Sequence, residues 1–324
     1  MRSQRLRRAL VAAFVSSLAP LSVHAEAPYP SQTIKFIVPN PAGGLPDTIT
    51  RIIGRRLQDR LGQAVVVENR PGANAGLGTS ALTGSPADGY TFLVTDGSIL
   101  SINPLLYAKL PYDPKSLLPV ALIGRAPLFL AAHPRVPAAS MKGLIEYAKA
   151  NPGKLNYGSI GIGSFHHLSM EAIKVALGLH MTHIPYKGSG ESVGALLGGH
   201  VDLLFSSYAA LRGPAETNKV KLIATNSARR SPQGPDVPSV AEFIPDFDLA
   251  VIQGIFAPIG TPRAIVQRIA SEVAAVVAEP DVVRQFAVAG IEPVGGGPDE
   301  FQAALKSEAE RVAKVVQAAG LKVQ

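Results

Sequence analysis

Two glycine-rich turns have the composition of an anion-binding site. The first covers residues 39–47 (PNPAGGLPD) and the second covers residues 158–164 (GSIGIGS). In each, a strand-like segment precedes the glycines and a helix-like segment follows them. Glycine lets the backbone approach a ligand closely, and the N–H groups at the start of the following helix have no intrahelical partner and can hold an anion. Either turn alone also fits ordinary turn chemistry, since Gly, Pro and Ser begin many helices.

Three polar side chains accompany these turns. Asp47 stands at a predicted helix start, where it either caps the helix, a role worth about 1 kcal/mol, or contacts the ligand or a bound water. Ser164 and His167 are three residues apart at the next such start and share a helix face. A Ser–His pair would suit a hydrolase, but Ser164 is not part of a G-x-S-x-G elbow. The one G-x-S-x-G string, at residues 190–194, places its serine inside the predicted helix 191–197 and not in a turn before a helix. A binding site is therefore favoured over a catalytic one, and we do not expect an enzyme.

The sequence also lacks the common motifs of nucleotide binding and metal binding. In a G-x-G-x-x-G pattern begun at Gly161, the sixth position is His166, and no glycine loop ends in Gly-Lys-Ser/Thr. His166 and His167 are adjacent in a predicted helix, so their side chains point in different directions and make poor joint metal ligands. There is no H-E-x-x-H and no cysteine. We expect no cofactor and no metal.

The N-terminus has the layout of a secretory signal. Arg2, Arg5, Arg7 and Arg8 precede an apolar run that ends near Leu21, and Val-His-Ala follows at 23–25. The run is too short to span a membrane, and small residues occupy the cleavage positions. We expect residues 1–25 to be a signal peptide, the mature chain to begin at Glu26, and the product to be soluble and periplasmic. An uncleaved membrane anchor is the alternative.

The charge and composition of the mature chain argue against nucleic acid as a partner. Without the four arginines of the signal, 27 basic and 24 acidic residues remain, a net charge of +3, and only 6% of residues are aromatic. A nucleic-acid-binding protein would need a concentrated basic face with stacking side chains, so no nucleic acid is expected. The absence of cysteine suits an exported bacterial protein that folds on core burial alone.

The chain alternates strand-like and helix-like segments, which predicts an α/β fold with mainly parallel sheets flanked by helices. Expected strands cover 33–38, 64–68, 90–95, 126–132, 155–157, 181–184, 201–205, 221–224 and 249–256. Expected helices cover 47–61, 75–82, 140–150, 164–177, 191–197, 262–278, 281–289 and 298–318. Ser140 is expected to cap the helix at 140–150.

About 300 mature residues are too many for one sheet. We predict two lobes, formed by residues 26–124 with 254–324 and by residues 125–253. Pockets favour domain interfaces and the carboxyl ends of parallel strands, so the ligand cleft is expected between the lobes.

Seven strings carry a resemblance that runs through nearly the whole mature chain. They are IKFIVPNPAGGLPD (34–47), VVVENRPGANAGLG (65–78), ADGYTFLV (87–94), INPLLYAKLPYDP (102–114), YAKANPGKLNYGSIGIGSFHHL (147–168), IPYKGSG (184–190) and APIGTP (257–262). In this order they resemble the Bug receptors, also called the TctC-type substrate-binding proteins of tripartite tricarboxylate transporters.

The resemblance implies a type II periplasmic-binding fold and a carboxylate held by backbone amides, hydroxyls and ordered water. The ligand-binding residues it points to are Ala42, Gly43, Gly44, Asp47, Ser159, Gly161, Gly163, Ser164 and His167. Ser98, in a turn that matches less closely, and Ser206 complete the predicted site. The segments 205–207 and 252–254 depart from the family pattern, because an acid or amide often follows the Phe of the first and an aromatic residue is common in the second.

Three functions remain open. A solute receptor would pass a small organic carboxylate to the membrane subunits of a tripartite tricarboxylate-type transporter. A sensory receptor would present the same ligand to a signalling partner, because fold does not settle function. A periplasmic serine hydrolase would use Ser164 and His167. We expect the receptor to act as a monomer.

Overall fold

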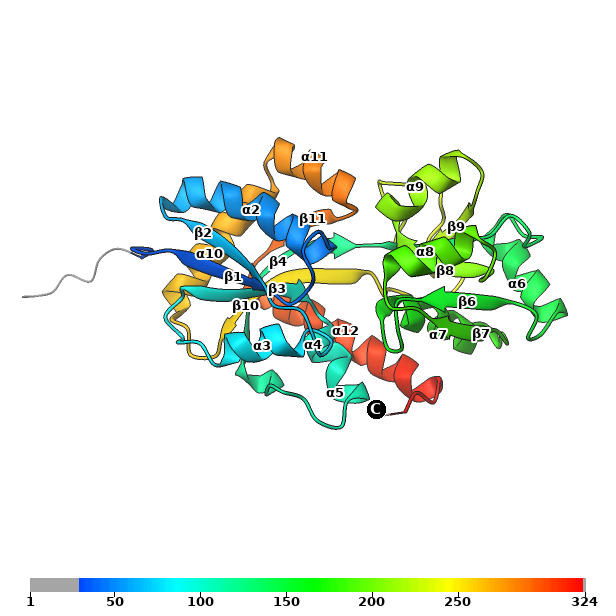
Figure 1. Cartoon of the computed structure of the whole chain (residues 1–324), viewed down its shortest axis with the longest axis horizontal. Coiled ribbons are helices and arrows are strands. Elements are labelled where there is room, and N and C mark those ends of the chain that lie inside the picture. The colour runs from blue at the N-terminus through cyan, green and yellow to red at the C-terminus, as the bar shows by residue number, and fades with distance from the viewer. Residues whose placement is uncertain (1–28, 323–324) are drawn as a thin grey trace, which may run out of the picture.

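The computed structural model describes residues 29–322, so the expected signal segment 1–25 lies outside the described residues. Two groups of strands and helices are joined by extended segments (Figure 1). We call the six-stranded sheet with its helices the first lobe, and the five-stranded sheet with its helices the second lobe. None of the helices within 29–322 has the length and apolarity to cross a bilayer.

The sheet of the first lobe is mixed. Its strands, in spatial order, are β11 (Glu292–Gly296), β4 (Leu117–Ala126), β10 (Val251–Pro258), β3 (Thr91–Asp96), β1 (Ile34–Val38) and β2 (Val65–Asn69). Strand β1 is parallel to β2 and β3, whereas β10 is antiparallel to β3 and β4, and β11 is antiparallel to β4.

The sheet of the second lobe is mixed in the same way. Its order is β7 (Thr182–Pro185), β6 (Asn156–Ser159), β8 (Leu203–Ser207), β5 (Leu128–Ala132) and β9 (Lys221–Thr225). Strand β6 is parallel to β7 and β8, and β5 is antiparallel to β8 and β9. The two-lobe α/β fold is confirmed, but the expectation of mainly parallel sheets is wrong. One reason is that the chain leaves the first lobe along β4 and returns along β10, so these neighbours run in opposite directions.

Helices cover both sheets. The first lobe has α2 (Leu45–Leu61), α3 (Gly76–Thr83), α4 (Ser98–Ser101), α5 (Asn103–Leu106), α10 (Arg263–Val277), α11 (Pro280–Ala289) and α12 (Pro298–Ala318). The second lobe has α6 (Met141–Ala150), α7 (Phe165–Leu177), α8 (Ser189–Leu197) and α9 (Tyr208–Glu216). Helix α6 has the predicted cap, since the Ser140 hydroxyl accepts from Gly143 N at 3.2 Å.

The sequence patterns did not predict several of the observed elements. Strand β4 contains Pro119 and Gly124, and β11 reads EPVGG, a composition typical of turns. Helix α9 contains Pro214, and α4 and α5 have four residues each. In these elements tertiary pairing and packing outweigh the local preference of the sequence.

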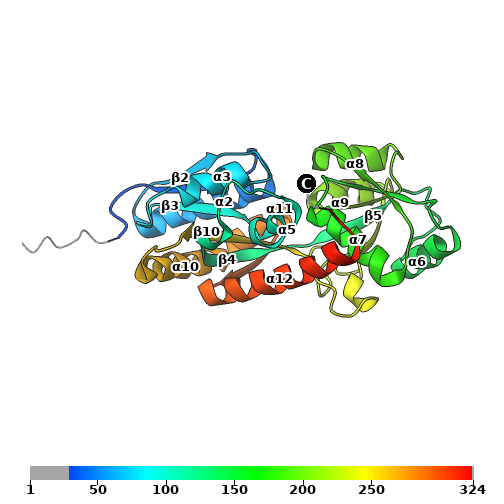
Figure 2. The same ribbon diagram turned by 90° about the horizontal axis from the view of Figure 1, so that it is seen from below.

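One hydrophobic core joins the two lobes beside the crossing strands. Ile102 and Leu106 of the first lobe pack in the same buried cluster as Phe165 and Leu168 of α7. The C-terminal half of α12 contributes Val312 and Val316 to this cluster, and Figure 2 shows α12 running from the first lobe to α7. The lobes therefore share apolar contacts along one side, which leaves the other sides of their interface for polar groups.

Candidate ligand-binding cleft

A cleft of about 540 Å³ lies between the lobes. Residues from both lobes and from the crossing strands line it. These are Asn40, Pro41, Gly43, Gly44, Leu45, Pro46, Asn74, Asp96, Ser98, Ile102, Ala126, Pro127, Leu128, Ile160, Gly163, Ser164, Phe165, His166, Ser189, Ser207, Val251 and Gln253.

The topology explains why these residues meet. Strands β1 and β3 are parallel, so their carboxyl ends lie at one edge of the first sheet. Strands β6 and β8 do the same in the second sheet. The segments that follow these four strands provide much of the lining, as expected for ligand sites in α/β folds.

Four helices of at least nine residues begin at the cleft: α2, α7, α8 and α9. The residues at their starts that line it are Gly44, Ser164, Ser189 and Ser207. The first N–H groups of a helix lack intrahelical partners, and the helix dipole makes that end positive. No Lys or Arg is among the described lining residues. An anion in this cleft would be held by main-chain N–H groups and hydroxyls.

The first glycine turn is braced by a buried carboxylate. Gly43 has a φ of +82°, and its N–H donates to Asp47 Oδ2 at 2.9 Å. Asn69 Nδ2 donates to Asp47 Oδ1 at 2.9 Å, and Arg51 Nε donates to Oδ2 at 3.0 Å. Burial opposes ionisation, but these donors outweigh it and hold the pKa of Asp47 below its usual value. The capping hypothesis for Asp47 is wrong in detail: the helix begins at Leu45 after Gly44, and Asp47 reaches back from the first turn.

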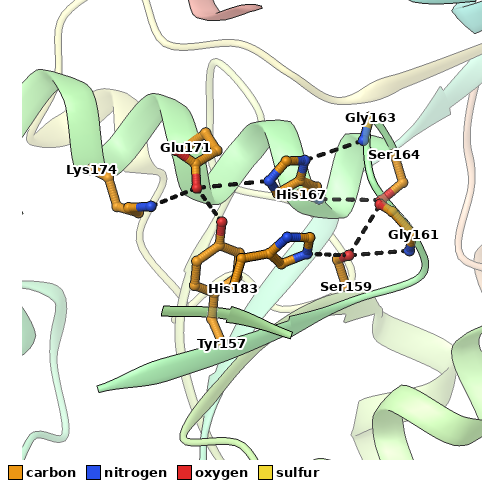
Figure 3. A network of polar contacts seen from close by, with 9 residues as sticks. All are labelled: Tyr157, Ser159, Gly161, Gly163, Ser164, His167, Glu171, Lys174 and His183. Atoms are coloured by element: carbon orange, nitrogen blue, oxygen red, sulfur yellow. Dashed lines mark hydrogen bonds and ion pairs between the residues drawn. The ribbon is translucent and has the colours of Figure 1, made fainter. Parts of the chain in front are cut away.

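The second glycine turn is braced by an imidazole. Gly163 has a φ of +78°, and its N–H donates to His167 Nδ1 at 3.1 Å. The Ser164 hydroxyl donates to Gly161 O at 2.8 Å and accepts from His167 N at 3.3 Å. Gly161 N in turn donates to the Ser159 hydroxyl at 3.1 Å. Figure 3 shows these contacts closing the turn upon itself.

A second imidazole supports the first. The rings of His167 and His183 stack with centroids 3.9 Å apart, and His183 Nε2 lies 2.7 Å from the Ser159 hydroxyl. Burial lowers the pKa of His167, and burial together with the charge on a protonated His167 lowers that of His183 to about 4. Both rings are therefore neutral near pH 7. Since His167 Nδ1 accepts from Gly163, its proton is on Nε2.

Glu171 closes this network away from the cleft. Lys174 Nζ donates to Glu171 Oε1 at 2.6 Å, the Tyr157 hydroxyl bonds to the same oxygen, and His167 Nε2 lies 3.7 Å from it (Figure 3). Burial opposes ionisation of Glu171, but the Lys174 and Tyr157 hydrogen bonds lower the pKa of Glu171 below its usual value. Glu171 thus bonds directly to Lys174 and Tyr157, while its distance to His167 Nε2 is too long for a hydrogen bond.

These contacts bear on the hydrolase alternative. A serine nucleophile requires a hydroxyl hydrogen-bonded to a base. The Ser164 hydroxyl donates to Gly161 O, and both His167 ring nitrogens face other groups. Ser159 does contact an imidazole, but Ser159 is fully buried and does not line the cleft. Neither pair presents an activated nucleophile to the cleft.

The predicted site residues fall into two layers. Gly43, Gly44, Ser98, Gly163 and Ser164 line the cleft. Behind the lining are the buried side chains of Asp47, Ser159, His167 and Ser206, while Ala42 and Gly161 belong to the turns without lining the cleft. Ser206 contacts the lining indirectly, with its hydroxyl 3.3 Å from that of Ser189.

The sequence reasoning missed several polar lining residues, namely Asn40, Asn74, Asp96, His166, Ser189, Ser207 and Gln253. Three of them have a buried atom without a partner: Asn40 Oδ1, His166 Nδ1 and Gln253 Oε1. An unsatisfied buried polar atom costs about 1–3 kcal/mol, so these atoms are available to a ligand. Burial lowers the pKa of His166 to about 4, which leaves it neutral. Asp96 and Gln253 fall in segments that match the family pattern poorly, and that mismatch was the available signal.

Known proteins agree with this architecture. The family model described as "Tripartite tricarboxylate transporter family receptor" matches residues 49–321. Protein BugT of Bordetella pertussis is 34% identical over 319 residues, covering 98% of each chain. A protein encoded in the tcbD-tcbE intergenic region of Pseudomonas sp. strain P51 is 33% identical over 315 residues, covering 96% of this chain and 94% of the relative.

Solved structures show the same fold. R. palustris Rpa4515 with adipate has a TM-score of 0.81 at 33% identity, covering 91% of this chain and 100% of the other. MatC from Rhodopseudomonas palustris with bound malate has a TM-score of 0.74 at 28% identity, covering 89% and 100%. With the family model matching most of its length, the chain belongs to the tripartite tricarboxylate transporter receptor family.

Proposed function

We propose that this protein is a periplasmic solute receptor that captures a small organic carboxylate and delivers it to the membrane subunits of a tripartite tricarboxylate-type transporter. One observation carries the proposal: four helix N-termini open onto a cleft whose described lining contains no basic side chain. Relatives of the same fold hold adipate and malate. The N-terminal sequence adds support for export.

The ligand carboxylate would bind between the two glycine turns. Gly43 N and Gly163 N already donate within the protein, to Asp47 and His167. The donors left for a ligand are those of the first helical turns, at Leu45 in α2 and at Phe165 and His166 in α7. Because α2 and α7 belong to different lobes, a carboxylate bridging them stabilises the closed arrangement. We place the hinge at the two crossings between the sheets, near residues 125 and 253.

Each helix end contributes modestly, about 0.3–1 kcal/mol when exposed and up to about 2 kcal/mol when partly buried. Useful affinity therefore needs several convergent donors, which the cleft provides through its helix starts and through the hydroxyls of Ser189 and Ser207. The protein is proposed to return its ligand unchanged and to act as a monomer.

The test is a thermal-shift screen of the mature protein against mono-, di- and aromatic carboxylates, followed by calorimetry. A ligand that binds only the native state raises the melting temperature. Uptake of the identified carboxylate by the encoding bacterium should then fall when the gene is deleted. A screen in which no carboxylate binds would refute the binding proposal, whereas binding with unchanged uptake would refute the transport role alone.

Export is tested separately. Intact-mass analysis of the periplasmic fraction should find a chain that begins at Glu26. A membrane-bound chain that retains Met1 would contradict the periplasmic assignment.

A further inference from the structure

Three polar residues lie at the cleft end of three adjacent strands of the first lobe. Gln253 of β10 is the direct Cα partner of Asp96 at the end of β3. Asn40 lies in the turn two residues after the end of β1, the strand that pairs with β3 on its other side. All three residues line the cleft. Residues directly opposite each other on neighbouring strands present their side chains on the same face.

Each member of this row, Asn40–Asp96–Gln253, has an acceptor that the protein leaves unused. Gln253 is 98% buried, yet its Oε1 has no partner, and Asn40 Oδ1 is also buried without one. Asp96 Oδ1 accepts from Ser98 N at 2.9 Å, and the Ser98 side chain also interacts with this carboxyl group, whose remaining lone pairs can accept from a further donor. Buried polar atoms are normally paired, so a row of three open acceptors indicates a missing donor.

The charge of the row is also unbalanced. Asp96 is the lining residue that carries a formal charge, and no Lys or Arg of the described lining faces it. On the side away from the cleft, Glu308 of α12 packs so closely on Gly97 that a Cβ at Gly97 would overlap its carboxylate. The Glu308 carboxylate accepts from the Ser101 hydroxyl at 2.6 Å. Burial raises the pKa of both acids, that of Glu308 to about 8. A cation beside the row would therefore stabilise the ionised form of Asp96.

We infer that the Asn40–Asp96–Gln253 row binds a protonated amine, so that the cleft selects amino carboxylates over dicarboxylates of matched length. An ammonium group has three donors and no acceptor, which matches three acceptor side chains, one of them a carboxyl group whose ionised form a cation would stabilise. The ligand's carboxylate would lie at the helix starts and its ammonium at the row. This inference rests on the proposed function, and it names the class of carboxylate.

The test compares ligands of matched length on the mature protein by calorimetry. The pairs are 4-aminobutyrate with glutarate and 5-aminopentanoate with adipate, and pentanoate reports a ligand with neither end group. Glutamate and aspartate extend the series to α-amino groups. We expect at least one amino carboxylate to bind at least tenfold more tightly than every dicarboxylate and than pentanoate.

Variants assign that preference to the row. Asp96→Asn should weaken the amino carboxylate at least tenfold and change pentanoate binding less than threefold. Gln253→Leu should also lower the affinity for the amino carboxylate. Asp59→Asn, an exposed acid on α2 outside the cleft, removes the same formal charge and should change nothing. Circular dichroism and melting temperature establish that each variant is folded.

Two outcomes would overturn the inference while leaving the proposed function intact. In the first, a dicarboxylate binds more tightly than every amino carboxylate. In the second, Asp96→Asn leaves the ratio between amine and dicarboxylate affinities unchanged. If no carboxylate of any kind binds, the proposed function itself fails.

Discussion

The two glycine turns are held in place by hydrogen bonds of the same pattern but to different side chains. In each, the N–H of a glycine with φ near +80° donates to a side chain four residues later, Asp47 in the first lobe and His167 in the second. Asp47 is an ionised carboxylate held by Arg51 and Asn69, and the turn beside it is open to solvent. His167 is a neutral ring within a buried network. The shared requirement is a rigid turn that leaves the next N–H groups free, and the lobes differ in how that rigidity responds to mutation and to pH.

The largest difference is expected for alanine at the two glycines. Either substitution places a side chain at positive φ, which costs about 1–2 kcal/mol. At Gly43 a Cβ meets nothing, whereas at Gly163 it overlaps Leu106 of the first lobe. Overpacking of this kind adds about 1–3 kcal/mol, because the Leu106 methyl must shift within the core that the two lobes share. Chemical denaturation should give a clearly lower free energy of unfolding for Gly163→Ala than for Gly43→Ala. Calorimetry should find the larger loss of ligand affinity at Gly163. Equal losses at both glycines would show that the turns are equivalent.

Removing the carboxylate brace should have the next largest effect. Asp47→Ala removes the carboxylate that accepts from Gly43 N, Asn69 Nδ2 and Arg51 Nε. Hydrogen bonds to a charged group contribute about 1.5–3 kcal/mol, and water at the exposed Gly43 replaces part of the loss. Asp47→Asn retains one acceptor oxygen and should recover part of the loss. Urea unfolding measures both variants. If Asp47→Ala is as stable as the parent protein, the brace is not structural.

Acid should weaken the second turn before the first. The pKa of His183 is about 4 in the folded protein, against about 6.5 in the unfolded chain. Between these values the unfolded state binds more protons, so the stabilisation is fully present above about pH 6.5 and is lost as the pH falls toward 4. The lowered pKa of Asp47 gives a dependence of the same sign in a lower pH range: its stabilisation persists down to about pH 4 and is lost below it.

Denaturation midpoints of His183→Gln between pH 7 and 4.5 should therefore fall less steeply than those of the parent protein. Exposed His180 provides the control, because His180→Gln should leave the slope unchanged. If the midpoint falls equally steeply with pH in all three proteins, His183 is not the cause of the pH dependence.

The smallest effect is expected at Lys187. This residue is exposed and absent from the lining of the cleft. Calorimetry on Lys187→Ala should find affinity within about twofold of the parent, a change of about 0.4 kcal/mol. Loss of binding in this variant would mean that a side-chain charge, rather than the main chain, holds the anion.

Local pattern alone was enough for much of this protein. Apolar periodicity and glycine stops located most helices and strands, because burial of one face and the freedom of glycine act over a few residues. Ser140 was identified as a cap on the same grounds, and the two turns followed from strand-to-helix order. The family was recognisable from strings such as those ending at Asp47 and Leu168.

Tertiary structure alone decided which of these residues face the ligand and which stand behind them. Asp47 and His167 turn back onto their own glycines, because each unpaired N–H needs an acceptor once the turn is packed. Asn40, Asp96 and Gln253 form one row although more than 200 residues separate the first from the last. Strand register sets that row, and register depends on which strands become neighbours, which no local pattern contains.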